Sequence, residues 1–177
     1  LVDREAFIVS SAMLKTHNAV VATMSVKNMV IGTPLHSAPN DTPAWHDKRK
    51  YHAGPHQMNY NMAISAMRER PAWGVGLIDG FEGMEGNGPS DGTPVPSRVA
   101  LASTDLLAAD RIGLECMGLP PHAVGYLQYA AQFGIGQFDI EKIDVLGPKP
   151  ETVKRTYRLH DTVQQQLEWL HDLPKAG

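Results

Sequence analysis

The sequence predicts a single α/β (or α+β) domain over residues 1–177, with a mixed, partly parallel sheet, flanking helices and a C-terminal amphipathic helix. Two observations lead to this prediction. Short apolar runs typical of strands alternate along the chain with segments of helical periodicity, which indicates a layered domain. The chain has 177 residues, of which 42% are hydrophobic and 20% charged, enough for one domain with a buried core.

The first half of the chain contains one clear strand, one clear helix and two ambiguous segments. Residues 6–14 ("AFIVSSAML") form a compact apolar run and are expected as a buried strand. Residues 19–32 fit either a strand or a helix. Residues 33–58 are rich in proline and lack periodicity, which indicates a long irregular loop. Residues 59–70 carry apolar side chains at near-helical spacing and predict a helix that stops before a proline.

The second half alternates between strand and helix signals. The predicted strands cover residues 72–80, 97–103 and 143–147, and the predicted helices cover 104–118, 123–134 and, at the C-terminus, 151–173. Thr104 or Asp105 is expected to cap the first of these helices, and Gly118 is expected to end it.

Composition excludes several classes of protein. The formal net charge of −3 gives no sign of a nucleic-acid partner, since such proteins usually show a basic excess. No apolar run reaches the roughly 20 residues of a membrane span, and the first residues lack the basic region of a signal peptide. We therefore expect a cytoplasmic protein with neither a nucleic-acid nor a membrane partner; its oligomeric state is not predicted.

The cysteine count limits redox chemistry. Cys116 is the single cysteine, so the chain forms no internal disulfide and cannot by itself hold an iron–sulfur cluster, which needs about four thiolates. Its spacing from neighbouring apolar residues favours a thiol buried in the core over a reactive nucleophile.

Polar side chains follow two apolar segments near the N-terminus. Lys15 and His17 stand at the end of the first predicted strand, where ligands of open α/β sheets bind. Lys27 and Asn28 follow the second apolar segment and combine a point charge with a directional amide, which suits a carboxylate or a phosphate. The alternative is a solvated strand end and an ordinary turn.

Histidines are concentrated in the irregular loop, which holds His36, His46, His52 and His56. Gly54 and a proline make a continuous helix between the last two improbable, but a loop can still bring histidines together. The stretch also contains a basic cluster over 48–50, suited to an anionic substrate. An exposed polar loop is the competing interpretation.

The glycine-rich stretch 82–94 ("EGMEGNGPSDGTP") follows the predicted strand that ends in Asp79. Asp79 and Glu85 are candidate ligands for a hard divalent cation such as Mg²⁺ or Ca²⁺, and Asn87 is a candidate ligand-binding residue. The spacing matches neither an EF-hand nor a phosphate-binding P-loop. The alternative is a surface turn.

Two acids lie in the helix predicted over 104–118. Asp105 and Asp110 stand five residues apart and point in different directions on a helix. Asp105 is expected as the cap, and Asp110 is a candidate buried hydrogen-bonding acid.

The order of these segments resembles the family called domain of unknown function 362, whose members are often described as uncharacterised iron–sulfur centre proteins. The resemblance covers roughly residues 1–147. Some relatives carry a cysteine-rich segment, and because this chain has one cysteine the iron–sulfur description does not transfer. Relatives are also longer at the N-terminus, which suggests that the native protein has a further N-terminal portion. The residues that carry the resemblance are Lys15-Thr16-His17, Lys27-Asn28, His52, Asp79, Glu85 to Pro89, Asp105 and Asp110.

Three hypotheses for function follow. The first is an enzyme acting on a small anionic substrate by His, Lys and carboxylate chemistry, with or without a divalent metal. Lys27 would then hold the anion, and His17 or His52 would act as a general base, with Lys15 as a third catalytic candidate. The second is a non-catalytic module that binds a metal or ligand and serves redox partners. In the third, the loop and the Lys-Asn turn serve only the fold.

Overall fold

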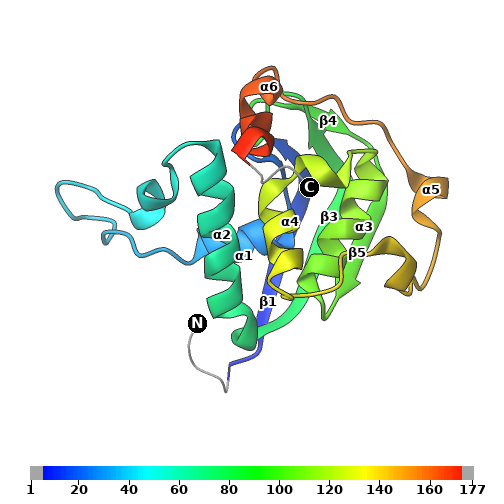
Figure 1. Ribbon diagram of the computed structural model, residues 1–177, viewed down its shortest axis with the longest axis horizontal. Helices are drawn as coiled ribbons and strands as arrows, with labels where there is room; N and C mark the ends of the chain where they lie inside the picture. The colour runs from blue at the N-terminus through cyan, green and yellow to red at the C-terminus, as the bar shows by residue number, and fades with distance from the viewer. Residues whose placement is uncertain (1–5, 173–177) are drawn as a thin grey trace.

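The computed structural model describes residues 6–172, and within this range five strands form one mixed sheet with helices packed beside it (Figure 1). The strands are β1 Ile8–His17, β2 Val21–Thr23, β3 Trp73–Glu85, β4 Thr93–Val95 and β5 Val99–Ser103. The α-helices are α1 Ser25–Gly32, α2 Pro55–Glu69, α3 Leu106–Met117, α4 Gly125–Gln132, α5 Pro150–Val153 and α6 Val163–Gln166. The 3-10 helices are η1 Asp47–Tyr51, η2 Arg70–Ala72, η3 Pro121–Ala123, η4 Ile140–Lys142 and η5 Leu167–Asp172.

The sheet is built around the parallel pair β1 and β3. The strand order is β2-β1-β3-β4, and β5 pairs with the first part of β3. β1 pairs in parallel with β3, for example Ala12 with Ile78, whereas the other pairings are antiparallel. The parallel pairing requires a crossover, and the chain makes it through α1 and α2 before returning in β3.

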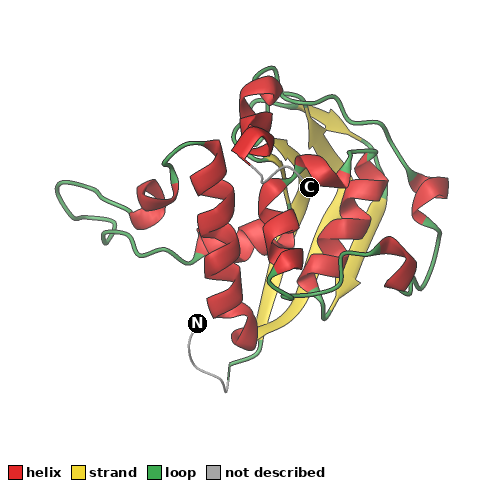
Figure 2. Ribbon diagram, in the orientation of Figure 1, coloured by secondary structure: helices red, strands yellow, loops and turns green. Residues whose placement is uncertain are grey.

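Helices cover one face of this sheet. Leu14 and Ile78 point from β1 and β3 into the core, where they join Leu106, Leu107 and Leu114 of α3. Figure 2 shows α3 lying over the strands and α2 beside them, with the loop 33–54 extending away from the body. The opposite face leaves side chains of β1 and β3 exposed, among them Val9, Met13, Leu77 and Phe81.

Most predicted elements are present, with shifted limits. The first strand and the helices over 59–70, 104–118 and 123–134 are confirmed. The ambiguous segment 19–32 contains both alternatives in turn, strand β2 and then helix α1. The helix begins there because the buried Asp110 carboxylate accepts the backbone N–H groups of Ser25 and Val26, at 2.8 and 3.0 Å.

Two predicted elements need correction. No strand forms over 143–147: Ile143 and Val145 do pack against the core, but the segment joins no strand ladder among residues 6–172. The C-terminal helix predicted over 151–173 is present only as α6 and η5, preceded by the short α5; residue 173 lies outside the described range. Between α5 and α6 the backbone is extended, because the N–H groups of Arg155 and Tyr157 donate to the carbonyls of Cys116 and Met117 at the end of α3.

The loop 33–58 is less irregular than predicted. His36 and His46 pair in an isolated bridge, η1 follows, and α2 already begins at Pro55. Proline at a first helical position lacks an N–H that would have no partner there, so it suits a helix start.

Candidate functional site

A cavity of about 330 Å³ opens at the C-terminal end of β1 and brings together four residues predicted from sequence. Lys15 and His17 reach it from β1, and Lys27 and Asn28 reach it from the first turns of α1. Its full lining is Ser11, Ala12, Met13, Lys15, His17, Thr23, Met24, Lys27, Asn28 and Pro89.

The lining carries basic groups and no carboxylate. Lys15 donates its Nζ hydrogen to the carbonyl oxygen of Pro89 at 3.3 Å. Within residues 6–172, neither Lys15 nor Lys27 forms an ion pair. A cationic cavity with no internal counter-charge is suited to an anion.

Lys27 is buried, whereas Lys15 is half-buried. Burial, followed by the nearby charges of Lys15 and Lys48, lowers the pKa of the Lys27 amine from 10.5 to about 8. A lysine with a pKa near neutrality can both hold an anion and exchange a proton with it.

His17 is held as a neutral hydrogen-bond donor. Burial lowers the pKa of its imidazole from 6.5 to about 3, and the charges of Lys27 and Lys15 and, more weakly, of His160 and His52 act in the same direction. The backbone N–H of Ala19 donates to Nδ1 at 3.0 Å, so the neutral ring carries its hydrogen on Nε2. With Nδ1 occupied, this ring is better suited to donate to an anion than to act as the general base that the sequence suggested.

Asn28 and Asp110 fix the helix that carries Lys27. The Asn28 amide donates to Ser10 Oγ and to the Ser11 carbonyl, both at 3.1 Å, and so ties α1 to the edge of β1. Asp110 is fully buried under the first turn of α1, and burial raises the pKa of its carboxyl to about 7, against the two backbone N–H donors.

The glycine-rich stretch contributes Pro89 to one wall of the cavity, and it contacts Lys15 and Thr16 through its backbone and not through the predicted side chains. Thr16 donates its hydroxyl hydrogen to the Gly86 carbonyl at 2.9 Å. A Cβ atom on Gly88 would lie 2.3 Å from the Thr16 carbonyl oxygen, so only glycine permits this approach. The contact places Pro89 where its carbonyl oxygen meets Lys15.

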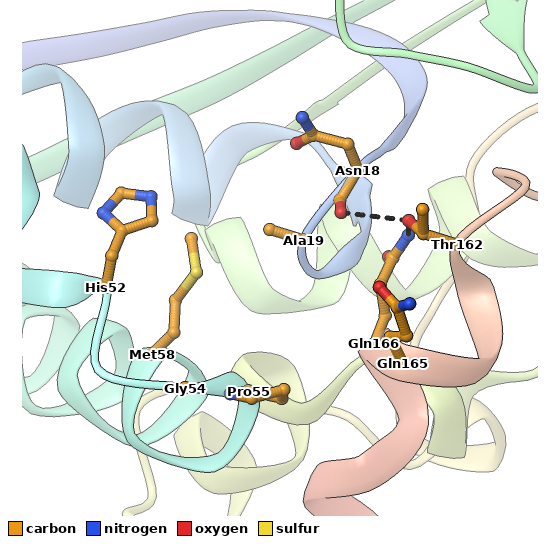
Figure 3. Close-up of a pocket in the computed structure, with 9 residues that line it drawn as sticks. All are labelled: Asn18, Ala19, His52, Gly54, Pro55, Met58, Thr162, Gln165 and Gln166. Atoms are coloured by element: carbon orange, nitrogen blue, oxygen red, sulfur yellow. Dashed lines mark hydrogen bonds between the residues drawn. The ribbon is translucent and has the colours of Figure 1, made fainter.

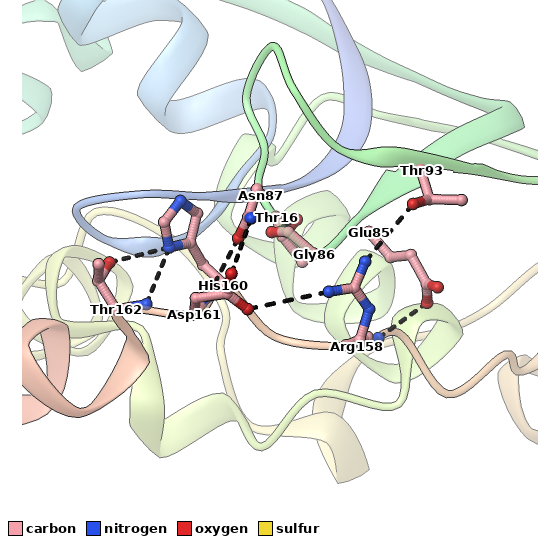
Figure 4. Close-up of polar contacts among 9 residues, drawn as sticks. All are labelled: Thr16, Glu85, Gly86, Asn87, Thr93, Arg158, His160, Asp161 and Thr162. Atoms are coloured by element: carbon pink, nitrogen blue, oxygen red, sulfur yellow. Dashed lines mark hydrogen bonds and ion pairs between the residues drawn. The ribbon is translucent and has the colours of Figure 1, made fainter.

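Glu85 and Asn87 do not line this cavity, and they bind the C-terminal part of the chain (Figure 4). Glu85 Oε2 accepts the backbone N–H of Arg158 at 2.8 Å. The Asn87 amide donates to Asp161 Oδ2 at 2.8 Å, and the Asp161 N–H donates back to Asn87 Oδ1 at 3.2 Å. The Gly86 N–H completes the contact by donating to the Arg158 carbonyl at 2.7 Å.

The predicted metal ligands Asp79 and Glu85 do not converge. Asp79 is exposed and accepts the backbone N–H of Phe81 at 2.9 Å. Glu85 lies six residues further along the same strand, and at roughly 3.3 Å per residue this separation exceeds any shared coordination. In the part of the chain that the structure describes, no group of three or more His, Cys, Asp or Glu residues is arranged to hold a metal ion.

His52 lines a second cavity of about 230 Å³ rather than the first (Figure 3). This cavity lies between Asn18 and Ala19 of the β1–β2 turn, Met58 of α2, and the C-terminal helical turns. His52 Nδ1 lies 2.9 Å from the Lys48 carbonyl oxygen. The two cavities interact electrostatically, because His52 of the second cavity contributes to lowering the pKa of His17 in the first. The lining residues are Asn18, Ala19, His52, Gly54, Pro55, Met58, Thr162, Gln165 and Gln166.

The remaining histidines of the loop do not join a site. His56 stacks on Tyr60, with ring centroids 6.3 Å apart, and His36 and His46 lie on the projecting loop. Cys116 is buried, and burial raises the pKa of its thiol to about 11, as expected for a core thiol. Sequence reasoning named Pro89 only as the end of the stretch Glu85 to Pro89, and it missed the other lining residues, which are Ser11, Ala12, Met13, Thr23 and Met24. Only the glycine pattern before Pro89 offered a signal.

Comparisons with known proteins agree with the resemblance seen in the sequence. The family described as "Domain of unknown function (DUF362)" matches residues 2–115. The thylakoid-associated protein sll1697 of Synechocystis sp. is 23% identical over 156 residues, which cover 88% of this chain and 46% of that protein. The chain therefore spans about half the length of this curated relative. No solved structure gives a significant match, and within residues 6–172 no helix is long and apolar enough to cross a membrane.

Proposed function

This chain belongs to the DUF362 family, and from that premise we propose that it binds a small anion, a carboxylate or phosphate, in the cavity between β1 and α1, where Lys27 exchanges a proton with the ligand. Lys15 and Lys27 supply the positive charge, and His17 donates a hydrogen bond from Nε2. The family description names no activity, so the proposal rests on the chemistry of the cavity.

The observation that carries the proposal is the convergence of two lysines and a neutral imidazole on one cavity lined by no acid. Burying a cation without a partner is costly, and the lowered pKa of Lys27 is a measure of that cost. An anion in the cavity would remove it, because an opposite charge within a few ångströms favours the charged amine.

Lys27 is the candidate acid–base group. Its pKa of about 8 leaves both protonation states accessible near neutral pH. A ligand whose reacting atom approaches the Lys27 amine could therefore gain or lose a proton there. A non-catalytic binding module would use the same cavity, and turnover of the bound anion distinguishes the two. A divalent metal at Asp79 and Glu85 stays a prediction, which the separation of the two carboxylates does not favour.

The test is anion binding to the purified protein. Isothermal titration with inorganic phosphate and with a series of small mono- and dicarboxylates would be carried out on the wild type and on Lys27→Met and Lys15→Met. Lys149→Met is the matched control, because it removes the same charge from an exposed residue at the start of α5 that does not line the cavity. We expect binding that both cavity variants reduce at least ten-fold and the control leaves unchanged.

Two outcomes would contradict the proposal. One is a wild-type protein that binds none of these anions. The other is binding that Lys149→Met weakens as much as Lys27→Met does, since the effect would then come from net charge and not from the cavity. The cytoplasmic location expected from the sequence stays a prediction. The relative from Synechocystis sp. is named as a thylakoid-associated protein.

A further inference from the structure

The short turn between β1 and β2 has an unfavourable backbone conformation. Residues 18–20 connect the strands, and Val21 directly after them has φ of 68°. The backbone N–H of Ala22 donates to the Val20 carbonyl oxygen at 2.8 Å, so Val21 stands at the centre of a γ-turn with positive φ, which is rare and strained. A β-branched residue with positive φ is a genuine outlier. Such a conformation persists only where neighbouring structure imposes it.

Gln166 of α6 is the neighbour that binds this strained residue. Gln166 is 3% exposed, and its Oε1 accepts the backbone N–H of Val21 at 2.6 Å. Its Nε2 donates to Thr162 Oγ1 at 3.1 Å, so both ends of the amide have partners. A buried amide with both ends engaged fixes the atoms it binds more firmly than an exposed one.

Thr162 lies against the other end of the same turn. Its Oγ1 lies 3.4 Å from the carbonyl oxygen of Asn18, the contact drawn in Figure 3. Thr162 Oγ1 also lies 2.9 Å from His160 Nδ1 (Figure 4). We call the segment 157–166 the strap. It contacts the turn at Asn18, the first residue of the turn, and at Val21, the residue that follows the turn.

This turn also determines the tautomer of His17. Ala19 lies between Asn18 and Val21, and its backbone N–H donates to His17 Nδ1. That bond leaves the ring hydrogen on Nε2, the nitrogen assigned above to the anion. If the turn relaxed, the Ala19 N–H would move and His17 would lose the bond that selects its tautomer.

The strap is itself fixed at its beginning. Tyr157 is buried, and its hydroxyl lies 2.8 Å from Ser97 Oγ. The next residues bind Glu85 and Asn87 of the glycine-rich stretch. The strap thus spans from the β3–β4 loop to the β1–β2 turn, on one side of the cavity region.

From these contacts we propose that Gln166 and Thr162 are positioning residues for the anion site: they hold the strained β1–β2 turn so that His17 presents Nε2–H to the cavity. The proposal rests on the proposed function for its ligand, but its effect on His17 is independent of any ligand.

The experiment compares Gln166→Ala and Thr162→Val with Gln165→Ala. The last is a matched control, because Gln165 is adjacent, is exposed and lines only the second cavity. Two quantities are measured in the full chain, under conditions where circular dichroism shows each variant folded. One is the dissociation constant of inorganic phosphate, and the other is the tautomer and pKa of His17 from long-range ¹H–¹⁵N correlation spectra across a pH titration.

We expect both strap variants to bind phosphate at least five-fold more weakly than the wild type. We also expect the single Nε2–H tautomer of His17 to give way to a mixture, with its pKa moving up toward the ordinary value as solvent enters. Gln165→Ala should change neither quantity. A simple loss of stability would not alter the tautomer of the folded protein, so that readout separates positioning from folding.

The outcomes are distinguishable. If the wild type binds no phosphate, the proposed function is in question, while the tautomer measurement still decides the role of the strap. Folded strap variants with the wild-type tautomer and pKa of His17 would overturn the proposal. If Gln166→Ala does not fold, Thr162→Val decides, since it replaces a partly exposed hydroxyl with a side chain of the same shape.

Discussion

Replacing Lys27 by methionine should make the protein more stable while it weakens anion binding. Lys27 is 8% exposed and has no carboxylate partner within residues 6–172. Methionine preserves most of the aliphatic stem and removes the charge. The prediction thus opposes the common result that a substitution at a buried site destabilises the fold.

The magnitude follows from the pKa of the amine. Folding lowers the Lys27 pKa from 10.5 to about 8, and each pH unit corresponds to about 1.4 kcal/mol. At pH 7 the charged amine is therefore disfavoured in the folded protein by at most about 3 kcal/mol. We expect Lys27→Met to gain 1–3 kcal/mol of unfolding free energy, on the order of that electrostatic cost less small packing losses.

The pH dependence provides the check on the cause. Between pH 8 and 10.5 the unfolded chain binds more protons at Lys27 than the folded chain does, so the unfolding free energy of the wild type rises with pH in this window. The variant lacks this rise. Urea unfolding of both proteins from pH 7 to 10.5, without added anions, should show the advantage of Lys27→Met shrinking above pH 8 and vanishing near 10.5. Parallel pH profiles, or a less stable variant at pH 7, would refute this reasoning.

Three further predictions concern the same region. Phosphate affinity of the wild type should fall about ten-fold between pH 7 and pH 9 as Lys27, with its pKa of about 8, loses its proton, and titrations of Lys27→Met should show no such step. His17→Asn keeps an acceptor for the Ala19 N–H but does not titrate. Because the pKa of His17 is about 3 in the folded protein against 6.5 in the unfolded chain, the unfolding free energy of the wild type should fall by up to about 1.4 kcal/mol per pH unit on acidification through this window. Denaturant curves at pH 4 to 7 should show a smaller fall for the variant. Gly88→Ala places a Cβ 2.3 Å from the Thr16 carbonyl, so we expect a loss of about 1–3 kcal/mol in thermal melts, whereas Gly32→Ala, with nothing within 4 Å, should be neutral or slightly stabilising; equal effects would contradict the close-approach argument.

The fold could be predicted where local chemistry decides it. Helix α3 was bounded correctly because Asp105 accepts the Ala108 N–H at its start and Gly118 adopts φ of 66° after its end. The segment 19–32 could not be divided from sequence, since the acid that starts α1 is Asp110, about 85 residues further along the chain. The extended backbone before α6 was missed for the same reason: its hydrogen-bond partners are the last carbonyls of α3.

The candidate site was predicted in part. Lys15, His17, Lys27 and Asn28 meet in one cavity, because residues at the carboxyl end of a strand and at the start of the following helix lie close together in this kind of fold. Glu85 and Asn87 were recognised as unusual, but their partners are 73 and 74 residues away in the strap. No local pattern indicates such pairings, so sequence identified these side chains without their orientation.

The contacts around the cavity join residues far apart in the sequence, and this has a consequence for the kinetics of folding. The contact of Lys15 with Pro89 joins residues 74 apart, and that of Val21 with Gln166 joins residues 145 apart. Contacts of high sequence separation form slowly, because the entropy of closing a long loop is lost before the contact can compensate for it. The cavity should therefore be among the last parts of the molecule to assemble. In a refolding experiment, the capacity to bind an anion should appear with the slowest phase, after most helical signal has already returned.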